Sequence, residues 1–291
     1  LSVNTFVIDT TAPTLSQVTA VDSPTNSTTP SYAFSSNEAG TISYGGSCSS
    51  GTTSAIIGTN SISFNTLNEG SYNCNIEVTD SAGNASSALS VNTFVIDTTG
   101  PTVSSVTSST NNDTYKLNDN ITVTVTFNDN LIVDNSIGNP RIQLETGTND
   151  RYANYISGNS SSVLSFLYSV QSGDNSSDLD YKATDSLYAN SGTIRDSATN
   201  DATLTLQSPG SSGSLGANKN LVIDGIIPTI TGFSPSDNSS FLKENTNFNV
   251  TFSEDIKTST LSTNTANTSC TGSVQLSSDN YSSCIRMNSL T

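Results

Sequence analysis

The stretch LSVNTFVIDTTGP, from Leu89 to Pro101, decides how the chain is organised. Its first eleven residues repeat Leu1 to Thr11 letter for letter, and a weaker copy, NLVIDGIIPT, runs from Asn220 to Thr229. In each copy a β-branched run ends at an aspartate, and a short spacer leads to a Pro-Thr pair. Val and Ile favour pleated strands, whereas proline cannot join the ladder of a central strand. Each copy is therefore predicted to be the last strand of one domain followed by the linker to the next.

The linkers divide the chain into four predicted segments. Residues 1–11 are predicted to be the last strand of a preceding repeat with its linker, and residues 12–98 a β-sandwich. Residues 99–225 are predicted to form a longer sandwich, and residues 226–291 a truncated one. Because self-similarity at long intervals is typical of arrays, we expect further copies before and after this chain.

The hydrophobic pattern predicts strands throughout. Residues 72–78 and 121–127 alternate apolar and polar side chains, which is typical of antiparallel strands with one buried face. We predict an all-β fold of tandem immunoglobulin-like antiparallel β-sandwiches arranged as an elongated rod. Residues 202–206 are expected to be one of the strands. The segment 208–218, SPGSSGSLGAN, is expected to be a flexible loop by its composition.

The composition excludes several classes of function. The net charge is −16, and the chain has no histidine, which rules out a Ser-His-Asp triad and a His-ligated zinc site. Such acidity argues against nucleic acid or an anionic membrane as a partner, and it favours divalent cations. No apolar run approaches the roughly 20 residues of a membrane span, so no membrane insertion is expected in this segment.

The four cysteines fall as two close pairs, Cys48 with Cys74 and Cys270 with Cys284. A CxxC motif is absent, which argues against zinc or thioredoxin chemistry. Two local disulfides formed in an oxidising, extracellular compartment are the favoured interpretation. Four buried free thiols are the alternative.

Acidic residues recur at corresponding places in each repeat: in the linker, in the turn after the second strand, and in the turn before the last strand. In a seven-strand sandwich these three places lie at the same end, next to the preceding linker. The predicted oxygen donors are Asp9, Glu38, Asp80 and Asn84 at the first linker, Asp97, Asp129, Asp196 and Asn200 at the second, and Asp224 and Glu254 at the third. Oxygen ligands alone select Ca²⁺, so we hypothesise calcium sites that stiffen the junctions.

Plain turn chemistry is the alternative for these positions, because Asp and Asn open turns by bonding their own backbone. The first site is expected to be the weakest. Its acid, Glu38, lies two places further from the preceding phenylalanine than Asp129 and Glu254 do from theirs.

Two further acidic patterns have weaker support. Asp174, Asp178 and Asp180 resemble a calcium loop, although the EF-hand glycine and distal glutamate are missing, and a solvated acidic loop is the alternative. Paired carboxylates serve glycoside hydrolysis in other proteins, but no aromatic-rich cleft is evident in the sequence. We therefore predict that the chain is not an enzyme.

The segment NEGSYNC, residues 68–74, resembles the immunoglobulin tyrosine corner, in which a tyrosine stands two places before the second cysteine of strand F. Asn68 replaces the usual aspartate, and the tryptophan of strand C is missing. Cys48 falls at the end of the predicted strand C rather than on strand B. Because strands C and F are neighbours, a bridge between them remains possible.

The junction signature, VIDTTAPT with DSAGN before the last strand, resembles the tandem bacterial immunoglobulin-like (Big-type) repeats of large surface adhesins. The third segment, from PTITGFSPSDN to NVTFSED, is similar to the Ig-like domain of surface-layer proteins. The first resemblance implies calcium at the junctions, through Asp9 with Asp80 and Asp97 with Asp196.

These patterns together predict a non-catalytic extracellular stalk of a large cell-surface protein. Its expected partners are neighbouring repeats of the same chain and a surface ligand of unknown identity. A self-assembling filament or surface layer, in which identical chains are partners, is the first alternative. A carbohydrate-binding module is the second, and exposed aromatic side chains clustered on one face would favour it.

Overall fold

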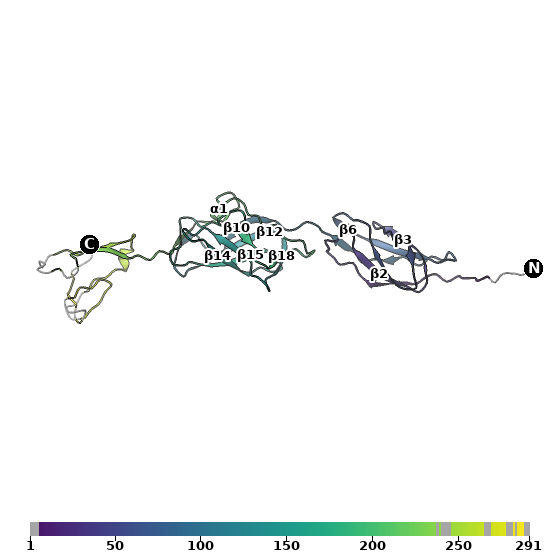
Figure 1. Ribbon diagram of the computed structural model, residues 1–291, viewed down its shortest axis with the longest axis horizontal. Helices are drawn as coiled ribbons and strands as arrows, with labels where there is room; N and C mark the ends of the chain where they lie inside the picture. The colour runs from purple at the N-terminus through teal and green to yellow at the C-terminus, as the bar shows by residue number, and fades with distance from the viewer. Residues whose placement is uncertain are drawn as a thin grey trace, which may run out of the picture. The chain divides into compact units, whose positions relative to one another are not determined.

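The computed structural model describes residues 6–236, 239, 246–264, 269–277, 282 and 284–287, and it confirms an all-β fold (Figure 1). The chain divides into two compact units, Leu1–Gly225 and Ile226–Thr291. The first unit has two separate hydrophobic cores, one on either side of the Asp97–Pro101 linker. Residues 1–5 of the first predicted strand lie outside the described part of the chain.

Residues 15–96 form the first sandwich from two main antiparallel sheets. One sheet has the order β1 (Leu15–Thr19), β2 (Ser31–Ser36), β5 (Gly58–Ser63). The other has the order β4 (Ser54–Ala55), β3 (Gly40–Gly46), β7 (Cys74–Thr79), β8 (Leu89–Ser90). In addition, β6 (Gly70–Tyr72) pairs with β9 (Phe94–Ile96). These pairings give the A-B-E and C-F-G order of an immunoglobulin sandwich.

The core of this sandwich follows from the predicted alternation. In β7 the side chains of Cys74, Ile76 and Val78 are buried, whereas those between them are half-buried. The rings of Phe64 and Phe94, both buried, stack with their centroids 5.9 Å apart. Apolar area removed from water in this way is the main driving force for each sandwich, at roughly 25 cal/mol per Å².

The second sandwich is larger and has one long sheet. Its order is β10 (Val103–Ser108), β12 (Asn120–Asp134), β15 (Ser161–Ser169), β14 (Arg151–Ser157), β13 (Arg141–Leu144), β17 (Leu187–Tyr188), and β18 (Thr193–Arg195) pairs with the end of β12. A smaller sheet has the order β11 (Asp113–Lys116), β19 (Leu221–Asp224), β16 (Asn175–Ser176), with β11 and β19 parallel. The alternating residues Ile121, Val123, Val125 and Phe127 are all buried, as predicted.

Two local predictions in this sandwich are wrong. Residues 202–206 do not form a regular strand, and Thr203 makes an isolated bridge with Thr102. The segment 208–218 is not simply a flexible loop, because it ends in a short helix, α1 (Leu215–Asn218). Ser214 caps this helix by accepting a 3.2 Å hydrogen bond from Ala217 N, and the side chain of Leu215 is fully buried. One apolar residue packed into the core thus overrides a composition typical of linkers.

The disulfide and tyrosine-corner predictions are confirmed. Cys48, just after β3, is bonded to Cys74 at the start of β7, and these two strands are neighbours in the sheet. The hydroxyl of Tyr72 donates to the carbonyl oxygen of Asn68 at 2.8 Å, as a tyrosine corner requires. In the second unit, Cys270 is bonded to Cys284.

The second unit contains a β-hairpin and a short 3₁₀ helix among its described residues. β20 (Ile230–Ser234) and β21 (Asn249–Phe252) are antiparallel, and η1 (Thr258–Thr260) follows them.

Candidate metal centre

Three acids predicted for the first linker lie together. Asp9, Glu38 and Asp80 each offer a carboxylate oxygen, and these three oxygens lie within 4.8 Å of one another. They come from the linker, the β2–β3 turn and the turn after β7. Asp80 is 9% exposed, Glu38 is half-buried and Asp9 is exposed. The strand order therefore assembles a cluster of oxygen donors from segments that are far apart in the sequence.

The turn after β7 holds Asp80 in place. Asp80 Oδ1 accepts hydrogen bonds from the backbone N–H groups of Ala82 (2.8 Å) and Asn84 (2.9 Å). The Asn84 side-chain amide donates to Asp80 Oδ2 at 2.8 Å and to the carbonyl oxygen of Asp9 at 3.2 Å. These bonds, the Asn84 side chain first among them, hold the pKa of Asp80 below its ordinary value. The turn thus keeps an ionised carboxylate beside the linker, so turn chemistry and cation binding would use the same residues.

The second linker has the same hydrogen bonds. Asp196 Oδ1 and Oδ2 accept from the backbone and side-chain nitrogens of Asn200, both at 2.8 Å. The Asn200 amide also donates to the carbonyl oxygen of Asp97 at 2.9 Å. Asp196 is only 1% exposed. The geometry therefore recurs although the turns read DSAGN and DSATN.

In each repeat, the residue directly before the acid predicted after the second strand is hydrogen-bonded to the start of the same domain. Its side-chain oxygen accepts from the backbone N–H of the threonine that follows the linker proline, and its own N–H donates to that threonine's carbonyl oxygen. The pairs are Asn37 with Thr14 (2.6 and 3.3 Å), Asn128 with Thr102 (2.7 and 3.1 Å), and Ser253 with Thr229 (2.9 and 2.8 Å).

These pairs place Glu38, Asp129 and Glu254 at corresponding positions, one residue after the pairing side chain. The offset of Glu38 from its phenylalanine was therefore the wrong measure, and the expectation that the first site is the weakest has no structural support. The sequence signal that was missed is a polar residue directly before the acid, together with the threonine after the proline.

Asp129 does not lie in a turn, contrary to the prediction. It lies inside β12, where the register shifts between Thr126 and Leu131 and the strand changes its partner from β15 to β18. Within the described part of the chain, Asp9, Glu38 and Asp80 are the one group of three acids with ligand atoms within 4.8 Å of each other. Asp97, Asp129 and Asp196, which were predicted together for the second linker, therefore do not form such a cluster.

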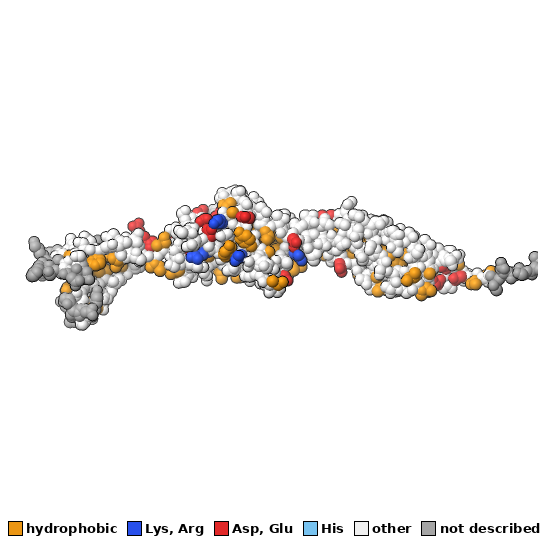
Figure 2. All heavy atoms as spheres, in the orientation of Figure 1, with side chains coloured by type: hydrophobic (Ala, Val, Ile, Leu, Met, Phe, Trp, Pro, Cys, Tyr) orange, Lys and Arg blue, Asp and Glu red, His pale blue; other side chains and the backbone are white. Residues whose placement is uncertain are grey.

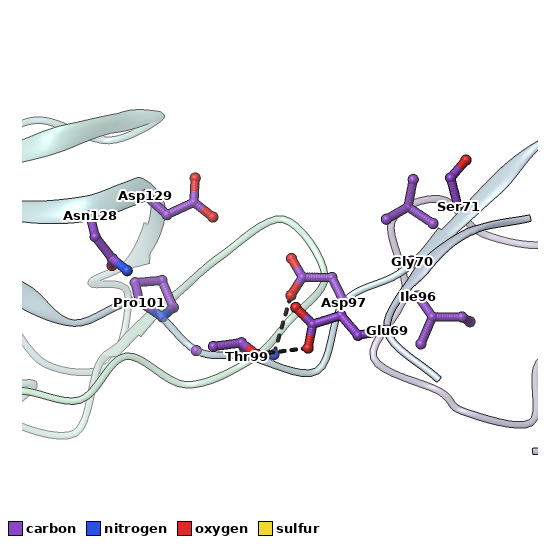
Figure 3. A pocket seen from close by; sticks show the side chains of 11 residues that line it. Glu69, Gly70, Ser71, Ile96, Asp97, Thr99, Pro101, Asn128 and Asp129 are labelled. Carbon is purple, nitrogen blue, oxygen red and sulfur yellow. Dashed lines mark hydrogen bonds between the residues drawn. The ribbon is translucent and has the colours of Figure 1, made fainter. Parts of the chain in front are cut away.

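A residue that the prediction missed, Glu69, lies at the second linker. Glu69, Asp97 and Asp129 line one open pocket (Figure 3). Thr99 binds two of these acids, because its N–H donates to Asp97 Oδ1 (3.2 Å) and its hydroxyl to Glu69 Oε2 (2.8 Å). In Figure 3, Asp129 stands apart from them, beside Pro101. The fold explains why Glu69 lies here, because the turn before β6 is at the end of the first sandwich nearest the second linker.

The second linker is also constrained by close backbone packing. A Cβ atom at Gly100 would lie 2.2 Å from the carbonyl oxygen of Asp201, so only glycine fits without movement. The backbone N–H of Thr203 donates to the carbonyl oxygen of Pro101 at 2.7 Å. The first linker has Ala12 at the position of Gly100.

The remaining predicted acids have different outcomes. Asp224 ends β19 in the first unit and Glu254 follows β21 in the second, so their site stays a prediction. Asp174 belongs to neither a calcium loop nor a solvated one, because it is 1% exposed and ion-paired. Its carboxylate accepts from Arg151 Nε, the Tyr168 hydroxyl and the backbone N–H of Gln171, at 2.7 to 2.8 Å.

The fold and the linkers define a chain of Ig-like β-sandwiches joined through hydrogen-bonded linker aspartates. Residues 2–98 match a family model described as a bacterial Ig-like domain, and residues 224–289 match a second model of the same description. The chain therefore carries bacterial Ig-like repeats, as the resemblance implied. The likeness of the third segment to surface-layer proteins stays a prediction.

The other comparisons add little. No curated protein matches the chain. Among solved structures, dimeric latent PorU from Porphyromonas gingivalis is similar at 15% sequence identity with a TM-score of 0.24, over 75% of this chain and 20% of that chain. This chain therefore spans about a fifth of PorU, and a likeness so weak carries no argument.

Membership of the Ig-like class has general consequences for function. Families of Ig-like domains are generally non-enzymatic, and such domains with disulfides are typical of extracellular proteins. Among the described residues, no helix has both the length and the apolar character needed to cross a bilayer.

Proposed function

We propose that the chain is a non-catalytic stalk segment of a cell-surface protein, and that Ca²⁺ bound at its linkers stiffens the junctions. The observation that supports this proposal is the recurrence of one linker geometry. Twice, an asparagine four residues after a buried or nearly buried aspartate donates to the carbonyl oxygen of the linker aspartate. A chain that only needed a turn before its last strand would have no use for the contact with the linker.

The donor set at the first linker fits calcium. Three carboxylates within 4.8 Å of one another repel each other, and a shared cation would remove that repulsion. All three donors are oxygens, which suit Ca²⁺ and not the transition metals that prefer nitrogen or sulfur. Because Asp9 belongs to the linker while Glu38 and Asp80 belong to the sandwich, a bound ion would join the two.

Calorimetric titration of the whole chain with CaCl₂, paired with thermal unfolding in Ca²⁺ and in EDTA, tests the metal. We expect binding and an increase in melting temperature for the wild type, and loss of both for Asp80→Asn at the first site. Asp22→Asn removes an exposed acid of the same sandwich that is outside the cluster, so it serves as the matched control. If Ca²⁺ neither binds nor stabilises the wild type, the stiffening mechanism is wrong.

Sedimentation of the purified chain over a range of concentrations tests the stalk role separately. We expect a monomer throughout, with or without Ca²⁺. Ordered association of identical chains would instead support the filament or surface-layer alternative.

A further inference from the structure

One outward face of the second sandwich differs from the rest of the first unit. On β13, β14 and β17, the side chains that alternate with the buried ones are polar or aromatic, apart from Ile156, which is 51% exposed. Tyr152 and Tyr188 make an edge-to-face pair with ring centroids 6.3 Å apart, and Tyr152 is 36% exposed. The Arg141 guanidinium lies 4.0 Å above the centre of the Tyr152 ring. Gln143 is paired across the strands with Tyr152, and Asn154 with Arg141. We call these five residues the tyrosine face.

The charge distribution sets this face apart. The first 98 residues contain no Lys or Arg, and in Figure 2 the basic side chains in view lie on the second sandwich. Three other basic residues of this sandwich are ion-paired, Arg151 with Asp174, Lys182 with Asp150 and Arg195 with Asp201. Lys219 instead donates to the carbonyl oxygen of Thr110 at 3.0 Å. Arg141 has no such ion pair, and its Nε atom is shielded from solvent without a hydrogen-bond acceptor.

We propose that the tyrosine face binds an acidic polysaccharide, with the carboxylate of a uronate residue on Arg141 and a sugar ring against Tyr152 and Tyr188. This role goes beyond the stalk proposed above and does not depend on calcium. Each part of the face has a matching part in such a ligand.

The guanidinium is a planar fork that matches the two oxygens of a carboxylate, and its position over Tyr152 restricts its movement. Tyrosine rings present large, rigid surfaces with few rotatable bonds, which suits contact with the apolar face of a pyranose. The exposed Asn154 amide has both donors and an acceptor for sugar hydroxyls, whereas the Gln143 amide already donates to Asp150 (3.4 Å) and accepts from Tyr188 (3.5 Å).

The anionic character of the ligand follows from charge complementarity. A net charge of −16 repels polyanions from most of this chain, and Arg141 is a basic side chain that is not in an ion pair and lies against an aromatic ring. One sheet face of the first sandwich, on β1, β2 and β5, shows the contrast. It has serine pairs, Ser16 with Ser35 and Ser31 with Ser63, in place of tyrosines and a cation.

Affinity electrophoresis of the whole chain in native gels tests this proposal. The gels contain polygalacturonate, alginate or hyaluronate as acidic polymers, neutral pullulan as the uncharged polymer, or poly-glutamate as a non-sugar polyanion. EDTA in every gel prevents calcium from bridging the carboxylates, so the result is independent of the linker sites. We expect at least one acidic polysaccharide to retard the chain, with no retardation by pullulan or poly-glutamate.

Four variants locate the binding. Arg141→Gln and Tyr188→Ala should weaken retardation at least fivefold, and Arg141→Lys, which keeps the charge without the fork, should also weaken it. Arg195→Gln makes the same charge change away from the face and should bind like the wild type. Circular dichroism melts of each variant confirm folding. The proposal is overturned if no acidic polysaccharide retards the chain, if pullulan or poly-glutamate retards it equally, or if Arg195→Gln loses as much as Arg141→Gln.

Discussion

Asn200 is the side chain on which the second linker depends most, and replacing it with alanine tests the linker geometry. Its amide donates to Asp196 Oδ2 at 2.8 Å and to the carbonyl oxygen of Asp97 at 2.9 Å. Asn200→Ala removes both bonds but keeps the backbone N–H that donates to Asp196 Oδ1 at 2.8 Å. Asp196 therefore stays buried, at 1% exposure, with one fewer donor.

The size of the effect follows from these contacts. A hydrogen bond to a charged group contributes about 1.5 to 3 kcal/mol, and one to a neutral carbonyl about 1 kcal/mol. We therefore expect Asn200→Ala to lower the free energy of unfolding of the second sandwich by about 2.5 to 4 kcal/mol. At about 1.4 kcal/mol per tenfold change, amides that exchange only by global unfolding should exchange about 60- to 700-fold faster.

Hydrogen–deuterium exchange with peptide resolution is the suitable assay, because it separates the two sandwiches within one chain. Asn84→Ala is the matched control, since it removes the same two kinds of bond at the first linker. Because Asp80 is more exposed than Asp196, at 9% against 1%, water replaces the lost donor more easily and the loss should be smaller. An Asn200→Ala effect below about fivefold, or one that appears equally in the first sandwich, would refute the reasoning.

Three other predictions concern single residues. Gly100→Ala should lower the stability of the second sandwich by about 1 to 3 kcal/mol in urea denaturation, because the new Cβ would lie 2.2 Å from the Asp201 carbonyl oxygen; an unchanged midpoint would contradict the packing. Tyr168→Phe should cost about 1.5 to 3 kcal/mol in the same assay, because it removes a 2.7 Å hydrogen bond to the buried Asp174 carboxylate; a neutral result would mean that water replaces the hydroxyl. The pKa of Asp80 is lowered in the folded state, so its contribution to stability is present above its unfolded pKa of about 3.9 and is lost as the pH falls through the folded value. Asp80→Asn should therefore flatten the fall in melting temperature below about pH 4, and equal slopes for the variant and the wild type would rule this out.

Much of the fold could be predicted because the pattern that indicates a strand depends on residues only a few positions apart. The alternation in residues 72–78 and 121–127 predicted the buried faces of β7 and β12, and both are confirmed. The repeated linker located the acids that lie near it. The sequence also predicted the disulfide between Cys48 and Cys74, because the four cysteines fall as two close pairs and no CxxC motif is present.

The site could be predicted only in part, because its distances depend on how strands bend and pair. Asp129 was assigned to a turn, whereas β12 continues through it and changes partner there. Asp174 was assigned to an acidic loop, but Arg151 and Tyr168 come from β14 and β15 to meet it. A local sequence pattern does not indicate which donor, distant in the sequence, binds a given carboxylate.

The sequence by itself determined the β-strand character of the chain, the alternation within its main strands, the place of the linkers and the acids carried by each repeat. These properties follow from side-chain alternation and turn chemistry, which act over a few residues. The tertiary structure alone decided that Asp9, Glu38 and Asp80 converge, that Glu69 joins the second linker, and that Arg141 lies over Tyr152. Each of these contacts joins different strands or turns, so it exists only once sheet order and register are fixed.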